Sequence, residues 1–250
     1  MHRFFVPPES ISDGSATLTG DQARQIARVL RLSSGDTIIL LDNSGQEFDV
    51  VLTAVSTSLV ECDVTQQRSG LGEPDIKITL FQSLLKGENF ELVLQKGTEL
   101  GVTRFVPVIT ERTIVRAPEG RRAASKMNRW QRIVTEAAEQ SRRARIPEIS
   151  TPLSFNEACI LVSHLALMPW EEEQTLSLRD ALSASKSEVE SDSGVSLIIG
   201  PEGGFSSQEA ELARHHGVQT VSLGRRILRA ETAAIAAVTA VCYELGEWEL

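Results

Sequence analysis

The sequence is poor in cysteine, in tyrosine and in long apolar runs. Its three cysteines, Cys62, Cys159 and Cys242, are far apart and follow neither a disulfide framework nor a metal-ligand spacing, so we expect buried, reduced thiols. The four histidines do not gather with them, and no metal site is predicted. No apolar run is long enough to cross a bilayer, and the start of the chain lacks the hydrophobic region of a secretory signal. We therefore expect a cytoplasmic protein without a membrane partner.

Positive charge is also scarce, because 25 Lys and Arg residues face 34 Asp and Glu residues, for a net charge of −9. The charges are segregated, however. Between Arg112 and Arg145 there are ten basic and three acidic residues, a local balance of +7 that leaves −16 for the rest of the chain. Salt screens charges beyond about 8 Å, so a basic face on an acidic body can still bind RNA phosphates. The alternative is a solvated helix face with ion pairs along the helix.

The hydrophobic pattern predicts two domains. Residues 1–70 are expected to form a small β-barrel with one helix at 21–32, because short apolar strands alternate with turn signals. Residues 71–75 are expected to be a linker, and residues 76–250 an α/β domain with a largely parallel sheet, since strands and helices alternate there. Residues 183–194 are rich in serine and acidic side chains, which predicts an exposed loop.

One glycine-rich stretch carries the strongest functional signal. The apolar run Leu197–Ile199 leads directly into Gly200-Pro201-Glu202-Gly203-Gly204, and a helix start follows it. Gly203 and Gly204 can take positive φ and let a ligand approach the backbone, while Ser206 or Ser207 can cap the helix. Such loops bind polar molecules through backbone amides. The common phosphate-binding motifs are absent, and an ordinary strand-turn-helix junction would also explain the glycines.

A second loop of the same kind follows about twenty residues later. The sequence Val221-Ser222-Leu223-Gly224-Arg225-Arg226-Ile227-Leu228-Arg229-Ala230 again runs from a short strand into a glycine and then into a long alanine-rich helix. Two such loops can face one pocket. In this order and with these residues, the pair resembles the C-terminal signature of the SPOUT methyltransferases, and within them the ribosomal small-subunit RNA uridine N3-methyltransferase family. The segments Gln95–Val102, Arg129–Pro147, Arg3–Val6 and Val29–Leu32 add to the resemblance.

The resemblance implies a fold and partners that periodicity could not reveal. It implies a knotted α/β methyltransferase domain (SPOUT, trefoil knot), a PUA-like N-terminal RNA-binding domain, a homodimer, and S-adenosyl-L-methionine as cofactor. The expected reaction is N3 methylation of uridine 1498 in 16S ribosomal RNA, within the small ribosomal subunit. The alternatives are a SPOUT enzyme that methylates another RNA base or a ribose, and a non-catalytic RNA-binding protein that keeps the fold.

The matching motifs imply cofactor and RNA contacts. Expected at the cofactor are Leu167, Met168, Ile199, Gly200, Pro201, Gly203, Gly204, Leu223, Gly224, Ile227 and Leu228. Expected at the RNA are basic residues of the N-terminal part and of the basic stretch: Arg3, Arg28, Arg31, Arg129, Arg142, Arg143 and Arg145.

The chemistry suggests the catalytic residues. Uracil N3 carries a proton that must leave before or during methyl transfer, and a nearby guanidinium would favour the uracil anion. Arg229 is the first candidate for this charge, with Arg3 a further candidate that could act across the dimer. Glu231 or a solvent path could accept the proton. The simpler alternative for Arg229 is an ion pair with a glutamate that only braces the helix start.

Overall fold

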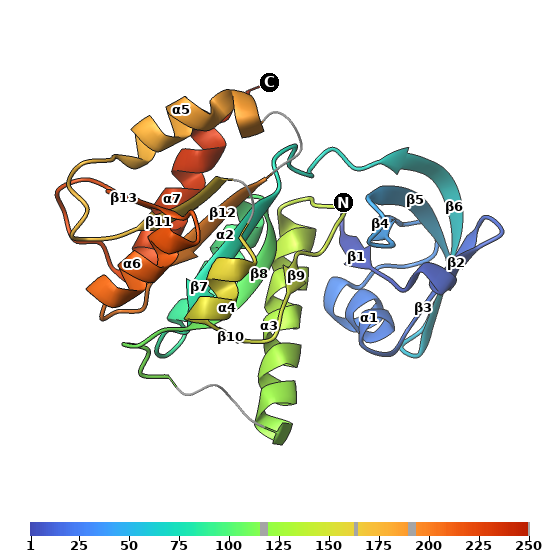
Figure 1. Cartoon of the computed structure of the whole chain (residues 1–250). Coiled ribbons are helices and arrows are strands. Elements are labelled where there is room, and N and C mark those ends of the chain that lie inside the picture. The colour runs from blue at the N-terminus through green and yellow to red at the C-terminus, as the bar shows by residue number, and fades with distance from the viewer. Residues whose placement is uncertain (116–119, 163–164, 190–193, 250) are drawn as a thin grey trace. The chain divides into compact units, whose positions relative to one another are not determined.

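A computed structural model of the chain describes residues 1–115, 120–162, 165–189 and 194–249 (Figure 1). The chain divides into two compact units. The first contains Met1–Glu73 and Ala138–Ile146, and the second contains Pro74–Ala137 and Pro147–Leu250. The division between Glu73 and Pro74 falls inside the expected linker, 71–75. The segment Ala138–Ile146 is a difference, because the sequence pattern assigned it to the second domain.

The first unit is built on a mixed sheet whose described strands follow the order β1-β4-β5-β6-β3-β2. Only β1 and β4 pair in parallel among these described strands, and the other neighbours are antiparallel. Two register shifts in β5 mark bulges, which bend the strand and increase its twist. The strands are β1 (Arg3–Phe5), β2 (Ile11–Ser12), β3 (Ser15–Thr19), β4 (Thr37–Leu41), β5 (Gln46–Val55) and β6 (Leu59–Ser69).

Strand β4 explains why Ala138–Ile146 belongs to the first unit. Its alternating residues enter two different apolar clusters, Ile38 and Leu40 in one and Ile39 and Leu41 in the other. The second cluster is completed by Phe5, Ala138 and Ala144. A continuous apolar strand is typical of burial on both faces, and the second face of β4 is covered by a segment about a hundred residues further on.

The expected helix at 21–32 is present in two pieces. They are α1 (Gly20–Arg24) and the π-helical turn η2 (Gln25–Leu30), which ends at Arg31 in the left-handed conformation, with φ of 55°. Ala23 and Ile26 are buried against the sheet, whereas Val29 is 72% exposed between exposed arginines. A short 3-10 turn, η1 (Pro8–Ser10), precedes β2.

The second unit is an α/β domain with a parallel sheet, which confirms the class of fold expected for residues 76–250. Its described strands follow the order β10-β8-β7-β12-β11-β13, and β9 pairs with Arg104 and Phe105 of β8. They are β7 (Ile78–Ser83), β8 (Val102–Ile109), β9 (Glu148–Ile149), β10 (Leu153–Ser154), β11 (Leu165–Pro169), β12 (Val195–Ile199) and β13 (Gln219–Val221). The helices are α2 (Asn89–Glu99), α3 (Gly120–Gln140), α4 (Phe155–Ile160), α5 (Leu178–Val189), α6 (Ser207–His215) and α7 (Ala230–Glu244).

The exposed loop expected at residues 183–194 is largely wrong, because α5 extends to Val189. Leu178, Ala181, Leu182 and Ser185 are buried, at the spacing of one helix face. The serines gave the segment a loop-like composition, but Ser183 is exposed on the outer face of this helix and Ser185 is buried on the inner face. Residues 190–193 lie outside the described part of the chain.

The three cysteines are free and buried, as expected. Burial raises the pKa of the Cys62 and Cys159 thiols to about 11 and that of Cys242 to about 12. Thiols with such pKa values stay protonated near neutral pH and are poor nucleophiles. Within the described ranges, no helix is long and apolar enough to cross a membrane, and no group of three or more His, Cys, Asp or Glu side chains is placed to hold a metal ion.

Candidate functional site

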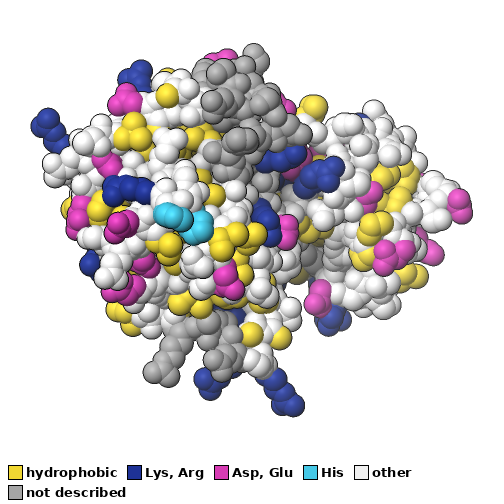
Figure 2. Space-filling model, viewed as in Figure 1, with side chains coloured by type: hydrophobic (Ala, Val, Ile, Leu, Met, Phe, Trp, Pro, Cys, Tyr) yellow, Lys and Arg dark blue, Asp and Glu magenta, His cyan; other side chains and the backbone are white. Residues whose placement is uncertain are grey.

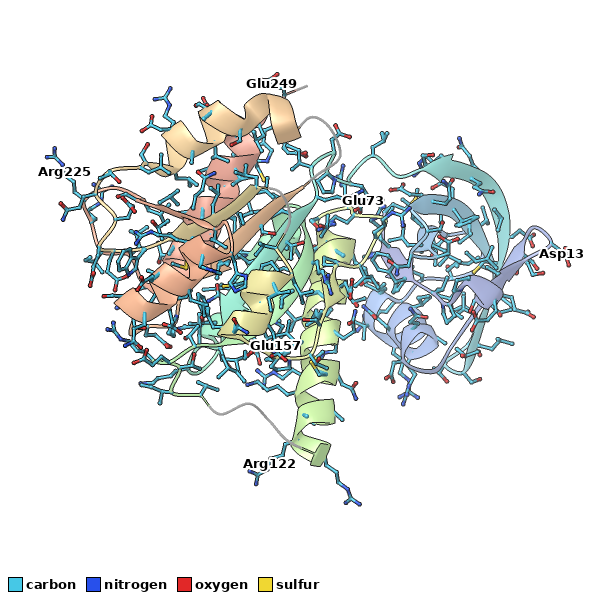
Figure 3. The ribbon with its side chains drawn as sticks, viewed as in Figure 1. Asp13, Glu73, Arg122, Glu157, Arg225 and Glu249 are labelled. Carbon is cyan, nitrogen blue, oxygen red and sulfur yellow. The ribbon has the colours of Figure 1, made fainter. Side chains whose placement is uncertain are left out.

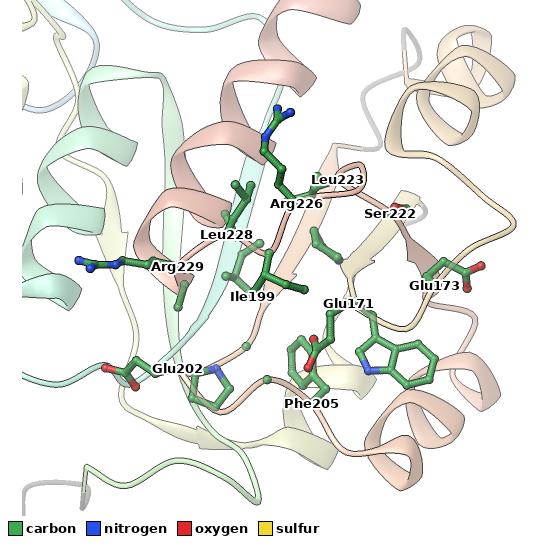
Figure 4. A pocket seen from close by; sticks show the side chains of 18 of the residues that line it. Glu171, Glu173, Ile199, Glu202, Phe205, Ser222, Leu223, Arg226, Leu228 and Arg229 are labelled. Carbon is green, nitrogen blue, oxygen red and sulfur yellow. The ribbon is translucent and has the colours of Figure 1, made fainter.

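A cavity of about 1050 Å³ opens at the carboxyl ends of the central strands of the second unit (Figure 4). Strand order changes direction between β7 and β12, since the chain runs from β7 to β8 and β10 on one side, and β11, β12 and β13 lie on the other side of β7. In open α/β sheets, ligands bind in the crevice that such a change creates. The walls come from the segments after β11, β12 and β13, and from Asn89 after β7.

The first wall is the glycine loop after β12. All five residues of β12 are buried, and the helix after the loop begins with a complete capping box. The Ser206 hydroxyl accepts the Glu209 N–H, while the Glu209 carboxylate accepts the Ser206 N–H at 3.0 Å. The expectation that Ser206 or Ser207 caps this helix is therefore confirmed for Ser206. Phe205 is buried beneath the loop, and a Cβ at Gly200 would stand 3.1 Å from its ring.

Three hydrogen bonds hold the glycine loop, one within the loop and two from residues outside it. The Gly204 N–H donates to Pro201 O at 3.0 Å, the Arg112 guanidinium to Gly203 O at 2.9 Å, and the Lys86 N–H to the Glu202 carboxylate at 2.8 Å. Within the loop only Gly204 has positive φ, at 68°, so the conformational freedom expected for both glycines is needed at one of them. The loop is thus preformed, with its glycine backbone facing the cavity.

The second wall is the loop that joins β13 to α7. Gly224 has φ of 100°, a conformation that favours glycine, and its N–H donates to Ser222 Oγ at 3.2 Å. Ser222 in turn exchanges backbone hydrogen bonds with Leu176 and Leu178, so the loop lies against the segment after β11. Leu223 and Leu228 give the wall its apolar surface, and Ile227 is 81% exposed.

The third wall comes from the end of β11 and the residues after it, and Leu167 and Met168, which were expected at the cofactor, lie within that strand. Leu167 and Met168 are fully buried within the sheet and do not line the cavity. Both residues precede Pro169, the last residue of β11, whereas the residues that reach the crevice lie at the last position of a strand or beyond it. The wall is formed by Pro169, Trp170 and the segment 171–174, where Glu171, Glu173 and Gln174 line the cavity.

Glu173 fixes this third wall to β13. Hydrogen bonds from the hydroxyls of Thr175 and Thr220 lower the pKa of Glu173 to about 2, so its carboxylate is charged at neutral pH. Arg214 pairs with the same carboxylate at 3.2 Å, and its guanidinium lies over the Trp170 ring, 5.1 Å from the ring centroid. The cavity wall is thereby braced by a polar network on its outer side.

The two candidates for catalysis in the second unit both line the cavity. Arg229 is the N-cap residue of α7 and is exposed, and no ion pair involves it among the described residues. The alternative of a bracing Arg–Glu pair therefore has no support from the geometry. Glu231 is buried in the first turn of α7, where the helix dipole favours a negative charge. In Figure 4, Arg229 and Glu202 lie on one side of the cavity and Glu171 and Glu173 on the other.

The expected RNA-binding arginines divide into buried and exposed ones. Arg3 pairs with Glu47 and has a side chain only 9% exposed, and Arg143 pairs with Glu73 at 3.0 Å with a side chain 3% exposed. Both arginines are held in ion pairs, and removing either one would leave a buried carboxylate without its cation. Glu73 also accepts the N–H groups of Ala144 and Arg145, so it holds the whole turn (Figure 3).

The remaining basic residues are exposed. Arg28, Arg31 and Arg142 have no ion pair within the described ranges, whereas Arg129 pairs with Glu91 at 2.6 Å and Arg145 donates to Ser44 O. Arg129 lies in the second unit and the other four in the first. On the face of the second unit visible in Figure 2, basic and acidic side chains are interspersed rather than gathered into a field of one sign.

The Arg143–Glu73 pair gives a stability prediction. Arg143→Gln should lower the free energy of unfolding by about 3 kcal/mol, because it leaves the Glu73 carboxylate partly buried without its cation. Arg142→Gln, one residue earlier and exposed, should change it by less than about 0.5 kcal/mol. Urea unfolding of the two variants and the wild type checks this. Equal stabilities for both variants would contradict a structural role for Arg143.

Comparison with known proteins places the chain in a class. The fold and the glycine-lined cavity at the switch point define an α/β enzyme domain with a small ligand-binding crevice. A family model described as an RNA methyltransferase domain matches residues 72–242, and one described as an RNA methyltransferase PUA domain matches residues 18–65. The first match covers most of the second unit, and the second lies within the β-rich first unit. The expected PUA-like N-terminal domain is thereby confirmed.

Individual proteins with similar sequences and structures define the family more closely. Ribosomal RNA small subunit methyltransferase E of Synechocystis sp. is 37% identical over 96% of this chain and 77% of its own length, and that of Bacillus subtilis is 32% identical over 98% and 97%. The crystal structure of ribosomal RNA small subunit methyltransferase E from Neisseria gonorrhoeae bound to S-adenosyl methionine superimposes with a TM-score of 0.84, at 34% identity over 97% of both chains. The chain belongs to the family of these RNA methyltransferases.

Several cavity residues were missed by sequence reasoning. Asn89, Glu171, Glu173 and Gln174 line the cavity but belong to no motif that the sequence pattern singles out. Their common signal is position, because Asn89 follows the carboxyl end of β7 and the other three follow that of β11, two strands that both neighbour β12. That signal depends on the order of the strands in the sheet, which the sequence does not reveal.

Proposed function

We propose that this protein transfers the methyl group of S-adenosyl-L-methionine to N3 of a uridine in 16S ribosomal RNA, at uridine 1498, as the resemblance of its motifs implies. The observation that carries the proposal is the cavity formed jointly by the two glycine loops after β12 and β13. The similarity to a structure bound to S-adenosyl methionine, over nearly the whole of both chains, supports the same cofactor here.

The cavity residues fit this cofactor. Ile199, Leu223 and Leu228 offer apolar surface for a purine, and the glycine backbone after β12 offers close approach for the polar parts of the ligand. When bound, the cofactor supplies a methyl group activated by a sulfonium. The task left to the protein is to align that methyl group with the acceptor nitrogen and to exclude water from both.

We infer that Arg229 acts on the acceptor base. Its guanidinium is exposed at the rim of the cavity and has no ion pair in the described part of the chain, so it is available to an incoming base. A cation beside uracil lowers the cost of removing the N3 proton, because it stabilises the anion that results. Glu231, which also lines the cavity, is the candidate to accept this proton, with solvent as the alternative.

The finer features of the fold are also proposals. We propose that the second unit is knotted, which is supported by the close passage of Ser222 against Leu176 and Leu178. We propose a homodimer, supported by the exposed apolar side chains Ile227 and Tyr243, at 81% and 73% exposure. Analytical ultracentrifugation should then give twice the chain mass of 27.3 kDa. The proposed site of action is the cytoplasm, where ribosomal subunits are assembled.

RNA binding by the first unit gives a second prediction. Replacing Arg28, Arg31 and Arg142 together by Gln should weaken binding to small subunits or their RNA and should flatten its salt dependence. Removing the charge that neutralises one phosphate reduces the slope of log affinity against log salt by nearly one. Binding measured between 50 and 300 mM salt, roughly the range over which counterion release is resolved, checks this. An unchanged slope would show that these arginines form only a solvated surface.

The reaction itself is tested on ribosomal RNA. Mass spectrometry of 16S RNA from a strain that lacks the gene should show loss of one N3-methyluridine, restored when the gene is returned. Purified protein with S-adenosyl-L-methionine should methylate small subunits from that strain. A methyl group missing from another base or from a ribose would favour the other SPOUT activities, and an unchanged methylation pattern would favour the non-catalytic RNA-binding protein.

A further inference from the structure

Four carboxylates line the cavity, and they differ in what the protein does with them. Glu173 is held by two threonine hydroxyls and Arg214, and Glu202 accepts the Lys86 N–H. Glu231 is buried in the first turn of α7. In the described part of the chain no hydrogen bond or ion pair involves the side chain of Glu171 or of Glu231, and of these two only Glu171 is exposed.

The position of Glu171 is closely defined by the glycine loop. A Cβ built on Gly204 would overlap Glu171 Oε1 and stand 2.9 Å from Oε2, so the carboxylate lies directly over the Gly204 backbone. In Figure 4, the Glu171 side chain points into the interior of the cavity, on the side away from Arg229. A negative charge therefore stands at the loop, remote from the cation that faces the acceptor base.

A cation stabilises an unpaired carboxylate in a partly enclosed cavity, because the apolar side chains of the wall replace part of the water that would otherwise hydrate it. S-adenosyl-L-methionine carries two cations, the sulfonium and the ammonium of its amino-acid part. We propose that Glu171 recognises the cationic methionine portion of the cofactor, an assignment that rests on the proposed function. With Arg229 on the opposite side, the cavity would be polarised, with a negative end for the donor and a positive end for the acceptor.

The chain offers a matched control for this assignment. Glu172 is the next residue, is also exposed, and does not line the cavity. Glu171→Gln and Glu172→Gln remove the same charge from the same segment, with nearly the same shape retained. A general effect of net charge on affinity would appear in both variants, whereas a direct contact with the cofactor would appear only in the first.

Calorimetric titration with three ligands tests the proposal. S-adenosyl-L-methionine carries both cations, S-adenosylhomocysteine only the ammonium, and 5′-methylthioadenosine neither. Glu171→Gln should lower the affinity for S-adenosyl-L-methionine by about tenfold, the scale of one charge-assisted contact. It should leave the affinity for 5′-methylthioadenosine within about twofold of the wild-type value. An equal loss of affinity for S-adenosylhomocysteine assigns the contact to the ammonium, and an unchanged affinity for it assigns the contact to the sulfonium.

Two results would overturn the assignment. One is an equal loss of affinity for all three ligands, which would mean that the substitution disturbs the shape of the cavity rather than a charge contact. The other is wild-type affinity of Glu171→Gln for S-adenosyl-L-methionine, or the same weakening in Glu172→Gln. Failure of the wild-type protein to bind S-adenosyl-L-methionine is a distinct outcome, because it would overturn the proposed function and the role of Glu171 with it.

Discussion

Gly204→Val is expected to abolish binding of S-adenosyl-L-methionine while the protein remains folded. Gly204 has φ of 68°, a region that a β-branched residue strongly disfavours. Its new Cβ would also overlap Glu171 Oε1, so either the loop or the carboxylate must move. Both changes occur inside the cavity, whereas the buried β12 and the capping box of α6, which support the loop, are left intact.

Thermal unfolding with and without saturating S-adenosyl-L-methionine measures this effect. A ligand that binds only the native state raises stability by mass action, by about 2.7 kcal/mol at a hundred times its Kd. The wild type should gain that stabilisation and Gly204→Val should gain none. Gly217→Val is the control, because Gly217 also has a positive φ, of 83°, but lies between α6 and β13 and does not line the cavity, so this variant should keep the stabilisation. A ligand-induced stabilisation of Gly204→Val equal to that of the wild type would remove the glycine loop from the proposed cofactor site.

The sequence predicted the two glycine loops because glycine and helix caps act locally. A strand that ends in glycines and is followed by a serine cap has few other conformations available, and Ser206 forms the cap. Asn89 and Glu171 carry no such local signal. They reach the cavity because β7, β11 and β12 are brought together in the sheet, and that arrangement depends on long-range packing.

The sequence also could not predict which arginine side chains are buried. The sequence around Arg3, Arg142 and Arg143 does not distinguish these arginines. Arg3 and Arg143 nevertheless form ion pairs and are buried, whereas Arg142 is exposed. The partners, Glu47 and Glu73, are distant in sequence. Arg142 and Arg143 are even adjacent, so no average over a window of sequence could have separated them.

The parallel α/β sheet was predictable because its strands and helices alternate along the chain. The boundaries of the first unit were harder to predict from the sequence. The apolar run Thr37–Leu41 correctly predicted a strand, and burial on both of its faces was compatible with its composition. Nothing local indicated that Ala138 and Ala144 would cover the second face. The expected boundary at residue 70 could therefore not include the segment that completes this core.

Arg229→Ala is expected to lower the methylation rate by at least about tenfold, or about 1.4 kcal/mol of transition-state stabilisation, with near-normal affinity for S-adenosyl-L-methionine. The reason is that the guanidinium acts on the acceptor base, on the side of the cavity away from Glu171. Arg229→Lys should restore little if the planar fork of arginine is what contacts the base. Single-turnover methylation of small subunits at saturating cofactor gives the rate.

The pH dependence separates this electrostatic role from a merely structural one. Without a cation that favours the uracil anion, the residual rate should rise more steeply toward alkaline pH, because hydroxide must then supply more of the deprotonation. Arg179→Ala is the control, since Arg179 is an exposed arginine of α5 in the same unit and does not line the cavity. It should keep the wild-type rate and pH profile. If Arg229→Ala also kept them, the charge that favours the anion would have to come from another group, and Arg229 would only cap α7.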